Sequence, residues 1–332
     1  MIVTRAPLRI SFIGGGTDLP NFFSKYDGRV ISTTIDKFVY VVVNKTLRNN
    51  ILLKYSITEE VPHPSLLRHT RVKAALLDLG VHEQIEIASL ADISSKVGLG
   101  SSSSFSVALL KSLNLFLNKN LDKKEAADQA CRLEIEILKE PIGKQDQYAA
   151  AFGGFNIFNF KKDGSVSVES VLLDSDKKDI LEKSVLLFLT GQFRDACSVL
   201  GEQKILVKNK IKPYRAMMES VYPFRDALVS GNIKLAGKIL DKNWQLKKTL
   251  CSKISNKIID KMYESGMKNG AYGGKILGAG GGGAILFLAP PEKHKIISNK
   301  LKKLASTEGL DEFRKIPVKF SENGVEVLFE SN

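Results

Sequence analysis

Long hydrophobic runs, paired cysteines and metal-binding histidine patterns are missing from this 332-residue chain. Its longest apolar runs, at 184–191 and 284–291, are less than half of the roughly 20 residues that a helix needs to cross a bilayer. The three cysteines form no CxxC pair and the four histidines form no HExxH motif, which argues against a zinc site or a disulfide framework. The N-terminus carries Arg5 and Arg9 within its apolar stretch and has no signal-peptide core. We therefore expect a cytoplasmic protein that spans no membrane.

The bulk composition is that of an ordinary globular protein. Hydrophobic residues make up 43% of the chain and charged residues 26%, which is too apolar for a disordered chain. At roughly 150 residues per domain the length favours two domains, and the composition changes near residue 190. We expect a first domain at 1–188 and a second at 189–332.

Basic residues outnumber acidic ones, 49 to 36, for a net charge of +13. Such an excess favours anionic partners, which include nucleic acids, membranes and phosphorylated small molecules. Residues 201–262 hold 14 basic and five acidic residues, and we interpret them as solvated faces of amphipathic helices. Aromatic residues are not interleaved with these lysines as stacking platforms for bases would be, so no nucleic acid partner is expected.

Strand-like and helix-like segments alternate in both halves of the chain. Val, Ile and Tyr enrichment predicts two β-rich pieces within 30–45, and a capping box at Asp122 and Glu125 predicts a helix over 123–139 that Pro141 ends. A largely helical stretch follows at 194–268, and a final strand is expected at 316–329. The alternation predicts an α/β or α+β protein of two lobes.

The loop VGLGSSSS at 97–104 precedes an apolar helix, so its backbone N–H groups and the helix N-terminus can hold a phosphate. Gly98 and Gly100 let a phosphate approach the backbone, and Ser101, Ser102 and Ser103 add hydroxyl groups. The lysine of an ordinary P-loop is missing. A helix capped by a serine is the alternative interpretation.

Two further glycine loops are less specific. The segment GAGGGG at 278–283 fits GxGxxG, but the strand follows it instead of preceding it, which rejects a dinucleotide fingerprint. Its glycines indicate close packing against another element or a ligand. The segment FIGGGTDLP at 12–20 places Thr17 and Asp18 after a turn, where Asp18 could cap a helix or bind sugar hydroxyl groups.

Two carboxylates stand out from their surroundings. Glu134 falls on the mostly apolar face of the helix predicted over 123–139, where a carboxylate needs a partner such as a divalent cation. Asp146 follows Pro141, with Arg9 on the first strand as a partner in space. A carboxylate placed in this way could orient a substrate hydroxyl group or accept its proton.

The three loops APLRISFIGGGTD, VGLGSSSS and KILGAGGGG, in this order, resemble the three motifs of the GHMP small-molecule kinases. The resemblance covers nearly the whole chain. In the galactokinase branch of that family, the metal-binding glutamate precedes the catalytic aspartate by twelve positions and a proline by seven, as Glu134 precedes Asp146 and Pro141. The motifs are most similar to the heptose 7-phosphate kinase branch. Lys144 stands where fucokinase-like relatives carry Trp.

The resemblance implies a fold and a site. The implied fold has an N-terminal domain with a left-handed βαβ crossover and a ferredoxin-like C-terminal domain. The implied catalytic residues are Asp146 and Arg9, and the implied Mg²⁺ ligands are Ser102 and Glu134. The implied ATP-phosphate loop comprises Gly98, Gly100, Ser101, Ser102 and Ser103. The implied substrate-binding residues are Gly15, Gly16, Thr17, Asp18, Gly280 and Gly281.

The activity that the resemblance implies is transfer of a phosphoryl group from ATP, with Mg²⁺, to the anomeric hydroxyl of a sugar. The expected acceptor is D-glycero-D-manno-heptose 7-phosphate, with Arg194 as the first candidate for its phosphate. Alternatives are a fucose- or galactose-type 1-kinase acting on free sugar and a catalytically silent sugar sensor. The expected partners are the sugar phosphate and ATP, and a homodimer stays open.

Overall fold

One long strand organises the larger of two sheets. The computed structural model describes residues 1–192, 199, 201–202 and 206–331. Strand β2 (Gly28–Lys45) runs unbroken through the segment where two β-rich pieces were expected, because β-branched residues continue along its whole length. Strand β1 (Ile2–Ile13) pairs antiparallel with it. On its other side, β2 pairs first with β6 (Phe155–Phe160) and then with β5 (Ile85–Ala91).

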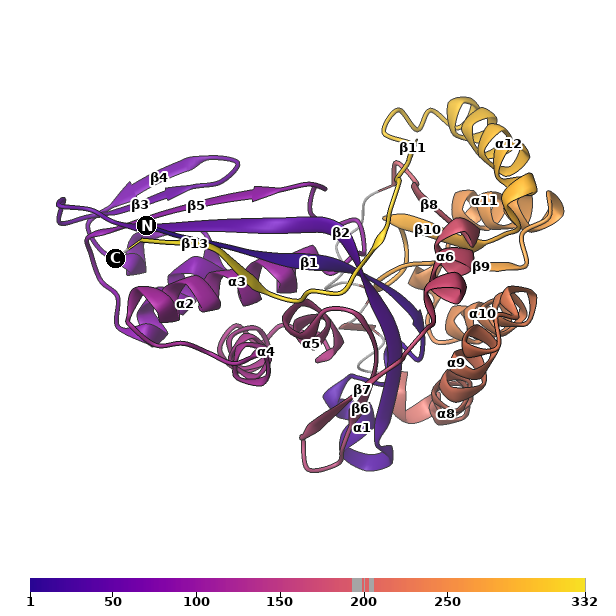
Figure 1. Cartoon of the computed structure of the whole chain (residues 1–332), viewed down its shortest axis with the longest axis horizontal. Helices are drawn as coiled ribbons and strands as arrows, with labels where there is room; N and C mark the ends of the chain where they lie inside the picture. Colours follow the sequence, from indigo (N-terminus) through magenta and orange to yellow (C-terminus); the bar gives the residue numbers. More distant parts are fainter. Residues whose placement is uncertain (193–198, 200, 203–205, 332) are drawn as a thin grey trace.

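The nine-stranded sheet has the order β13-β1-β2-β5-β3-β4, with β6 and β12 also paired to β2 and β7 paired to β6. The C-terminal end of the chain returns to this sheet, where β13 pairs with β1 and β12 pairs with β2, so the single strand expected at 316–329 is two short ones. Figure 1 shows β13 alongside β1. The remaining strands of this sheet are β3 (Ile51–Lys54), β4 (Thr58–Val61), β7 (Val166–Ser170), β12 (Phe320–Ser321) and β13 (Glu326–Glu330).

Helices cover one face of this sheet (Figure 1). They are α2 (Thr70–Leu79), α3 (Ser101–Phe116), α4 (Lys123–Cys131) and α5 (Gln145–Phe152), and the short α1 (Pro20–Tyr26) lies near β6. Helix α3 has an almost entirely buried sequence from Ser103 to Asn114 and packs against β1 and β2. This burial anchors the N-terminus of α3, and with it the serine-rich loop, at a fixed place on the sheet.

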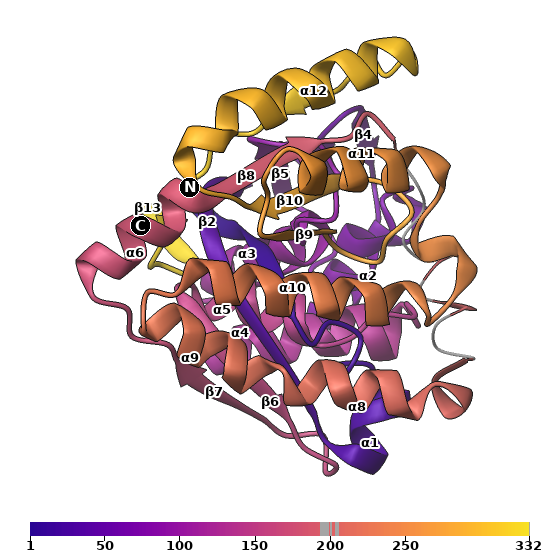
Figure 2. The ribbon, with the colours of Figure 1, turned by 90° about the vertical axis from the view of Figure 1, so that its right-hand side faces the viewer.

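The second sheet has four antiparallel strands in the order β11-β8-β10-β9. Its strands are β8 (Val185–Leu189), β9 (Gly273–Ile276), β10 (Ala284–Leu288) and β11 (Arg314–Lys315). The helices of this part are α6 (Ser175–Ser184), α8 (Ile211–Glu219), α9 (Val221–Val229), α10 (Ile233–Lys248), α11 (Lys257–Lys268) and α12 (His294–Thr307). Figure 2 looks onto these helices, among which α10 packs against β9 and β10.

One mixed and one antiparallel sheet, packed with helices, confirm the α+β fold class. The pair β3 and β5 is parallel, with β4 and α2 between its strands in the chain, and the handedness of that connection stays a prediction. The expected boundary between 188 and 189 falls inside β8, so the two-domain division also stays a prediction. In the described ranges no helix is long and apolar enough to cross a membrane.

The helix predicted over 123–139 changes its winding partway along. It is α-helical to Cys131 and then continues as a π-helix over Arg132–Ile137. Such wide turns are rare and are frequent at functional sites. Glu134 lies within this turn and is fully buried, as its place on the apolar face predicted.

Candidate active site

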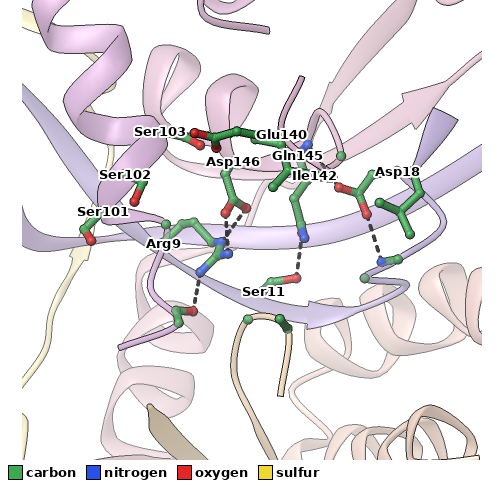
Figure 3. A pocket seen from close by; sticks show the side chains of 18 of the residues that line it. Arg9, Ser11, Asp18, Ser101, Ser102, Ser103, Glu140, Ile142, Gln145 and Asp146 are labelled. Atoms are coloured by element: carbon green, nitrogen blue, oxygen red, sulfur yellow. Dashed lines mark hydrogen bonds and ion pairs between the residues drawn. The ribbon is translucent and has the colours of Figure 1, made fainter. Parts of the chain in front are cut away.

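A cavity of about 290 Å³ lies where the loops of the larger sheet meet the second sheet. Its wall is built from the end of β1 and the loop after it, the serine-rich loop, the segment leading into α5, and parts of α10 and β9. These segments include most of the residues that sequence reasoning selected. Figure 3 shows the cavity from close by.

Arg9 and Asp146 point toward each other within this cavity (Figure 3). Arg9 Nε donates to Asp146 Oδ1 at 2.8 Å and Arg9 Nη2 donates to Asp146 Oδ2 at 2.6 Å. Two parallel hydrogen bonds of this kind fix the orientation of the carboxylate as well as its position. The pairing predicted between these two residues is confirmed.

An irregularity in β1 directs Arg9 to this place. The register between β1 and β2 shifts between Pro7 and Arg9, because proline offers no N–H for the ladder. The backbone N–H of Arg9 donates instead to the carbonyl of Leu99 at 2.9 Å, and its Nη1 donates to the carbonyl of Gly98 at 2.6 Å. Bulges that redirect a side chain are common beside active sites. Arg9 therefore connects Asp146 to the serine-rich loop.

The serine-rich loop ends in helix α3, and the serine-cap interpretation is wrong. The N-cap is Gly100, in the left-handed region with φ of 79°, and no side chain caps the helix in the described structure. Gly98, Gly100, Ser101, Ser102 and Ser103 all line the cavity. Because the first N–H groups of a helix lack partners within it, this end of α3 can bind an anion.

The second and third glycine-rich loops pack against each other through their backbones. A Cβ atom on Gly98 would come within 2.5 Å of the Leu277 carbonyl oxygen, and one on Gly278 within 2.7 Å of the Gly98 Cα. One on Gly283 would come within 2.5 Å of the Val97 carbonyl oxygen. Side chains at these positions would therefore separate the segment Val97–Gly98 from the loop at 277–283.

Asp18 lines the cavity on the side away from the serines (Figure 3). It does not cap α1, whose N-cap is Leu19. Its Oδ1 accepts the Gly16 N–H at 2.8 Å and its Oδ2 accepts the Gln145 N–H at 3.3 Å. Burial, and next the charge of Asp146, raise the pKa of Asp18, while these two backbone bonds lower it. The carboxylate keeps further lone pairs for substrate hydroxyl groups.

Of the other expected substrate-binding residues, Gly15 and Gly16 line the cavity, but three do not. The hydroxyl of Thr17 is buried and donates to the carbonyls of Gly14 and Arg29, so it shapes the loop behind the wall. Gly280 and Gly281 pack against Ile254, whose carbonyl accepts the Gly281 N–H at 2.8 Å. From that loop it is Gly278 and Ala279 that reach the cavity.

Glu134 lies behind the serine-rich loop, outside the cavity lining. Its Oε2 accepts from Ser103 Oγ at 2.8 Å and from Gln147 Nε2 at 2.5 Å, and its Oε1 accepts from Ser106 Oγ at 2.6 Å. Arg71 Nε lies 3.2 Å from Oε1. The carboxylate is thus fully hydrogen-bonded and has a cationic neighbour, which is what a buried carboxylate requires.

Carboxylate and hydroxyl oxygens are the donors that Mg²⁺ prefers. Glu134 and Ser103 supply such a pair, and Ser103 also lines the cavity, so the residues fit the ion. Glu134 is hydrogen-bonded to Ser103, whereas Ser102, the serine that the resemblance implies as an Mg²⁺ ligand, lines the cavity beside it, so that role of Ser102 stays a prediction. No three His, Cys, Asp or Glu side chains gather as a metal cluster in the ranges described. Mg²⁺ commonly takes one or two carboxylates and completes its shell with substrate phosphates and water.

Sequence reasoning missed two buried lysines of the cavity wall. Lys247, in the stretch interpreted as solvated helix faces, is 4% exposed, and Lys275 is 2% exposed. In α10, the buried Leu240, Trp244 and Lys247 follow helical spacing, and this was the available signal. Arg194, the residue expected to bind the acceptor phosphate, lies outside the described residues.

Two family models match the chain in order. The model of the GHMP kinases N terminal domain matches residues 67–154. The model of the GHMP kinases C terminal matches residues 224–306. Together the two matches cover half of the chain and include the serine-rich loop, Glu134, Asp146 and the third glycine loop.

Curated relatives match over nearly their whole length. The D-glycero-alpha-D-manno-heptose 7-phosphate kinase of Campylobacter jejuni is 29% identical to the chain, with 91% of this chain and 93% of that protein covered. The galactokinase of Pyrococcus furiosus is 28% identical, with 90% and 92% covered.

Solved structures share the fold. A crystal structure titled as a D-glycero-D-manno-heptose 1-phosphate kinase from Bacteriodes thetaiotaomicron superimposes with a TM-score of 0.82 at 24% identity, over 100% of both chains. The galactokinase of Lactococcus lactis in complex with galactose gives a TM-score of 0.80 at 16% identity, over 98% of this chain and 95% of that one.

Proposed function

The chain belongs to the GHMP kinases, and from that premise we propose that it phosphorylates the anomeric hydroxyl of a heptose 7-phosphate with ATP and Mg²⁺. The family is confirmed by the two ordered domain matches, and the named relatives identify a sugar kinase that transfers phosphate to a hydroxyl. The acceptor, the anomeric position and the metal are the proposal. The observation that carries it is the Arg9–Asp146 pair, held between the serine-rich loop and Asp18.

The similarity to the Campylobacter jejuni enzyme supports the choice of acceptor, because it extends over more than nine-tenths of both chains. The product would be the 1,7-bisphosphate, an intermediate suited to nucleotide activation of the sugar. Asp18, Gly15 and Gly16 face the same cavity and offer a carboxylate and open backbone to a polyhydroxylated ring. These groups suit a sugar of any kind, so the relatives carry the choice among sugars.

Each part of the cavity has a role in the transfer. The N–H groups and hydroxyls of Gly98–Ser103 would hold the phosphates of ATP. Asp146 would accept the proton of the anomeric hydroxyl while the oxygen of that hydroxyl bonds to the γ-phosphorus of ATP. The bond between the γ-phosphorus and the β–γ bridging oxygen breaks at the same time, which releases ADP. Arg9 would keep Asp146 in line and place positive charge beside the transferred group. Most of the catalysis in such transfers comes from positioning and charge neutralisation.

Glu134 and Ser103 would hold Mg²⁺, with Ser102 close to the same wall. The ion would neutralise charge on the β- and γ-phosphates. Arg71 bridges Glu134 to Glu140, with its Nη2 donating to Glu140 Oε2 at 2.6 Å. When a metal ion displaces the Arg71 guanidinium from Glu134, the second carboxylate, Glu140, can still hold that guanidinium.

A panel of acceptors tests the proposal. ADP release is measured with D-glycero-D-manno-heptose 7-phosphate, the same heptose without phosphate, galactose and fucose, with Asp146→Asn as the control for contaminating kinases. We expect the highest kcat/KM for the heptose 7-phosphate and a phosphorus NMR signal coupled to the anomeric proton. Higher kcat/KM for galactose or fucose would instead establish a 1-kinase for free sugar, the alternative that the similarity to galactokinases favours.

A catalytically silent sugar sensor is the other alternative. It predicts binding of ATP and sugar by calorimetry without ADP release on any acceptor. The Arg9–Asp146 pair argues against it, because a sensor has no use for a carboxylate held in line beside the nucleotide loop.

A further inference from the structure

Among the described residues, the two buried lysines of the cavity wall have hydrogen bonds to backbone carbonyls alone. Lys247 comes one residue before the end of α10, and Lys275 lies in β9. The Nζ of Lys247 donates to the Gly278 carbonyl at 2.6 Å. The Nζ of Lys275 donates to the carbonyls of Ser11 and Phe12 at 2.9 and 2.8 Å. We call Lys247 and Lys275 the lysine pair.

No carboxylate neutralises the lysine pair in the described part of the chain. The ion pairs among cavity residues join Arg9 to Asp146 and Arg71 to Glu140, and neither lysine takes part in one. An ammonium group has three N–H donors, so Lys247 retains two beyond its bond to Gly278. A buried charge without an ionic partner is costly, and proteins keep one where a ligand supplies the opposite charge.

The electrostatics of the wall agree with this view. Burial, and next the charge of Arg9, lower the pKa of Lys247 to about 8, although Asp18 and Asp146 act in the opposite direction. Burial and the charges of Lys247 and Arg9 hold the pKa of Lys275 well below its usual range. Each cation is therefore destabilised by the others, and an anion among them would be bound strongly.

The position of the lysine pair indicates which anion it binds. Lys275 contacts the carbonyls of β1 directly before the loop that carries Gly15, Gly16 and Asp18. Lys247 is close enough to Asp18 and Asp146 for both charges to affect its pKa. We assign these groups to the acceptor side of the cavity, because Asp18 lies on the side away from the serines (Figure 3), and we assign the loop Gly98–Ser103 to the nucleotide phosphates.

We propose that Lys247, with Lys275 beside it, binds an anionic group of the acceptor, namely the phosphate that distinguishes a sugar phosphate from a free sugar. The inference rests on the proposed function and names the residues that read its acceptor. A phosphate dianion would favour the protonated form of both lysines, and its oxygens would accept the free N–H donors of Lys247. Lys275 has two of its three donors bound to β1, so at most one is left for the phosphate and Lys247 makes the main contact.

Kinetics of Lys247→Gln test the proposal, since glutamine keeps an N–H donor for the Gly278 carbonyl and removes the charge. We expect kcat/KM for heptose 7-phosphate to fall at least about tenfold more than kcat/KM for the unphosphorylated heptose, the loss typical of a charged hydrogen bond. The KM for ATP should be near the wild-type value. Lys248→Gln is the matched control, because Lys248 is the next residue of α10 and does not line the cavity. Its Nζ lies 3.6 Å from Asp260 Oδ1. The two kcat/KM values of this control should match those of the wild type.

Equal losses on the phosphorylated and the free heptose, or a fall in kcat alone, would overturn the proposal and assign Lys247 to the transferred phosphoryl group. A wild-type enzyme that phosphorylates free sugars as well as sugar phosphates would overturn it while leaving the kinase activity intact. Melting curves of Lys247→Gln establish that the variant is folded.

A binding measurement decides the case even if no sugar is turned over. The protein is saturated with a non-hydrolysable ATP analogue, which occupies the nucleotide loop, and inorganic phosphate is added. The melting temperature of the wild type should then rise with phosphate concentration, as for any ligand of the folded state, and that of Lys247→Gln should not. An equal rise in both proteins would overturn the proposal.

Discussion

Arg9 donates two parallel hydrogen bonds to Asp146, one from Nε to Oδ1 and one from Nη2 to Oδ2. The third nitrogen of the same guanidinium donates to the Gly98 carbonyl, so one side chain joins the carboxylate to the serine-rich loop. A lysine could satisfy only one of these directions at a time, because its ammonium is a point charge without the planar fork. In the proposed reaction, the relationship between these two residues would set the geometry of the transfer.

Asp146→Asn should lower kcat by at least about 100-fold, because the amide cannot accept the acceptor proton as a carboxylate does. ATP affinity should be close to the wild-type value, since Asp146 contacts Arg9 and not the serine-rich loop. Steady-state kinetics and calorimetric titration with ATP measure the two quantities. Turnover at the wild-type rate would remove Asp146 from the mechanism.

Arg9→Lys should lower kcat by at least about tenfold, because it replaces a three-way fork with a single ammonium. Arg5→Lys is the matched control on the same strand. Arg5 also pairs with a carboxylate, Glu326 at 2.8 Å, but at the partly exposed far end of β1, where an ion pair is worth little. Similar kcat values in the two variants would show that the fork at Arg9 does not matter for turnover.

Glu134→Gln should raise the Mg²⁺ concentration needed for half-maximal activity by about tenfold or more, because one charged ligand is lost while the amide keeps the shape. Removing metal with EDTA should abolish turnover of the wild type. Glu136→Gln, an exposed position in the same π-helix, serves as control and should leave the Mg²⁺ titration unchanged. An unchanged titration in Glu134→Gln as well would contradict the role of Glu134.

Gly98→Ala should destabilise the fold more than Gly80→Ala. Both glycines have positive φ, 79° and 70°, so alanine costs about 1 kcal/mol at each through backbone strain. Only at Gly98 would the new methyl group meet backbone, at 2.5 Å from the Leu277 oxygen, while at Gly80 nothing lies within 4 Å. That contact should add about 1–3 kcal/mol, measured by urea unfolding. Equal losses in the two variants would show that the loops separate without cost.

The sequence was informative where function depends on short, ordered motifs. The three glycine loops and the burial of Glu134 were predicted from turns, strand ends and helical spacing that are visible locally. The pairing of Arg9 with Asp146, which are 137 positions apart, was predicted through the resemblance to the GHMP kinases. The contact of Glu134 with Ser103 was not predicted, since it depends on how the π-helix over Arg132–Ile137 meets α3.

The lysine pair shows why the rest could not be predicted. Helical spacing shows that Lys247 shares a face with Leu240 and Trp244, but not that this face ends at a cavity. The excess of basic residues in 201–262 led to the interpretation that these lysines are exposed to solvent, and that interpretation is wrong for Lys247. Lys275 stands in the short strand Gly273–Ile276, all of it buried, whose partner carbonyls lie more than 260 residues away in the chain. Such tertiary neighbours leave no mark in a single sequence.

Lys247→Gln should make the unliganded protein more stable at pH 7, by at most about 4 kcal/mol, because a buried charge is removed and one pKa unit corresponds to about 1.4 kcal/mol. The pKa of Lys247 is about 8 in the folded protein and 10.5 is its ordinary value. Between these values the unfolded chain binds a proton that the folded protein does not, so the stability of the wild type rises with pH relative to the variant. The groups that act on Lys247 are Arg9, Asp18, Cys251, Asp146 and Lys275.

The measurement is urea unfolding of both proteins from pH 7 to pH 10. The advantage of Lys247→Gln should be full below pH 8 and should shrink steadily as the pH rises above it. Saturating phosphate should reverse the order at pH 7, because the anion stabilises only the protein that retains the cation. A stability difference that stays constant across this pH range would mean that Lys247 is not a buried charge held for a ligand, and the anion site would lose its physical basis.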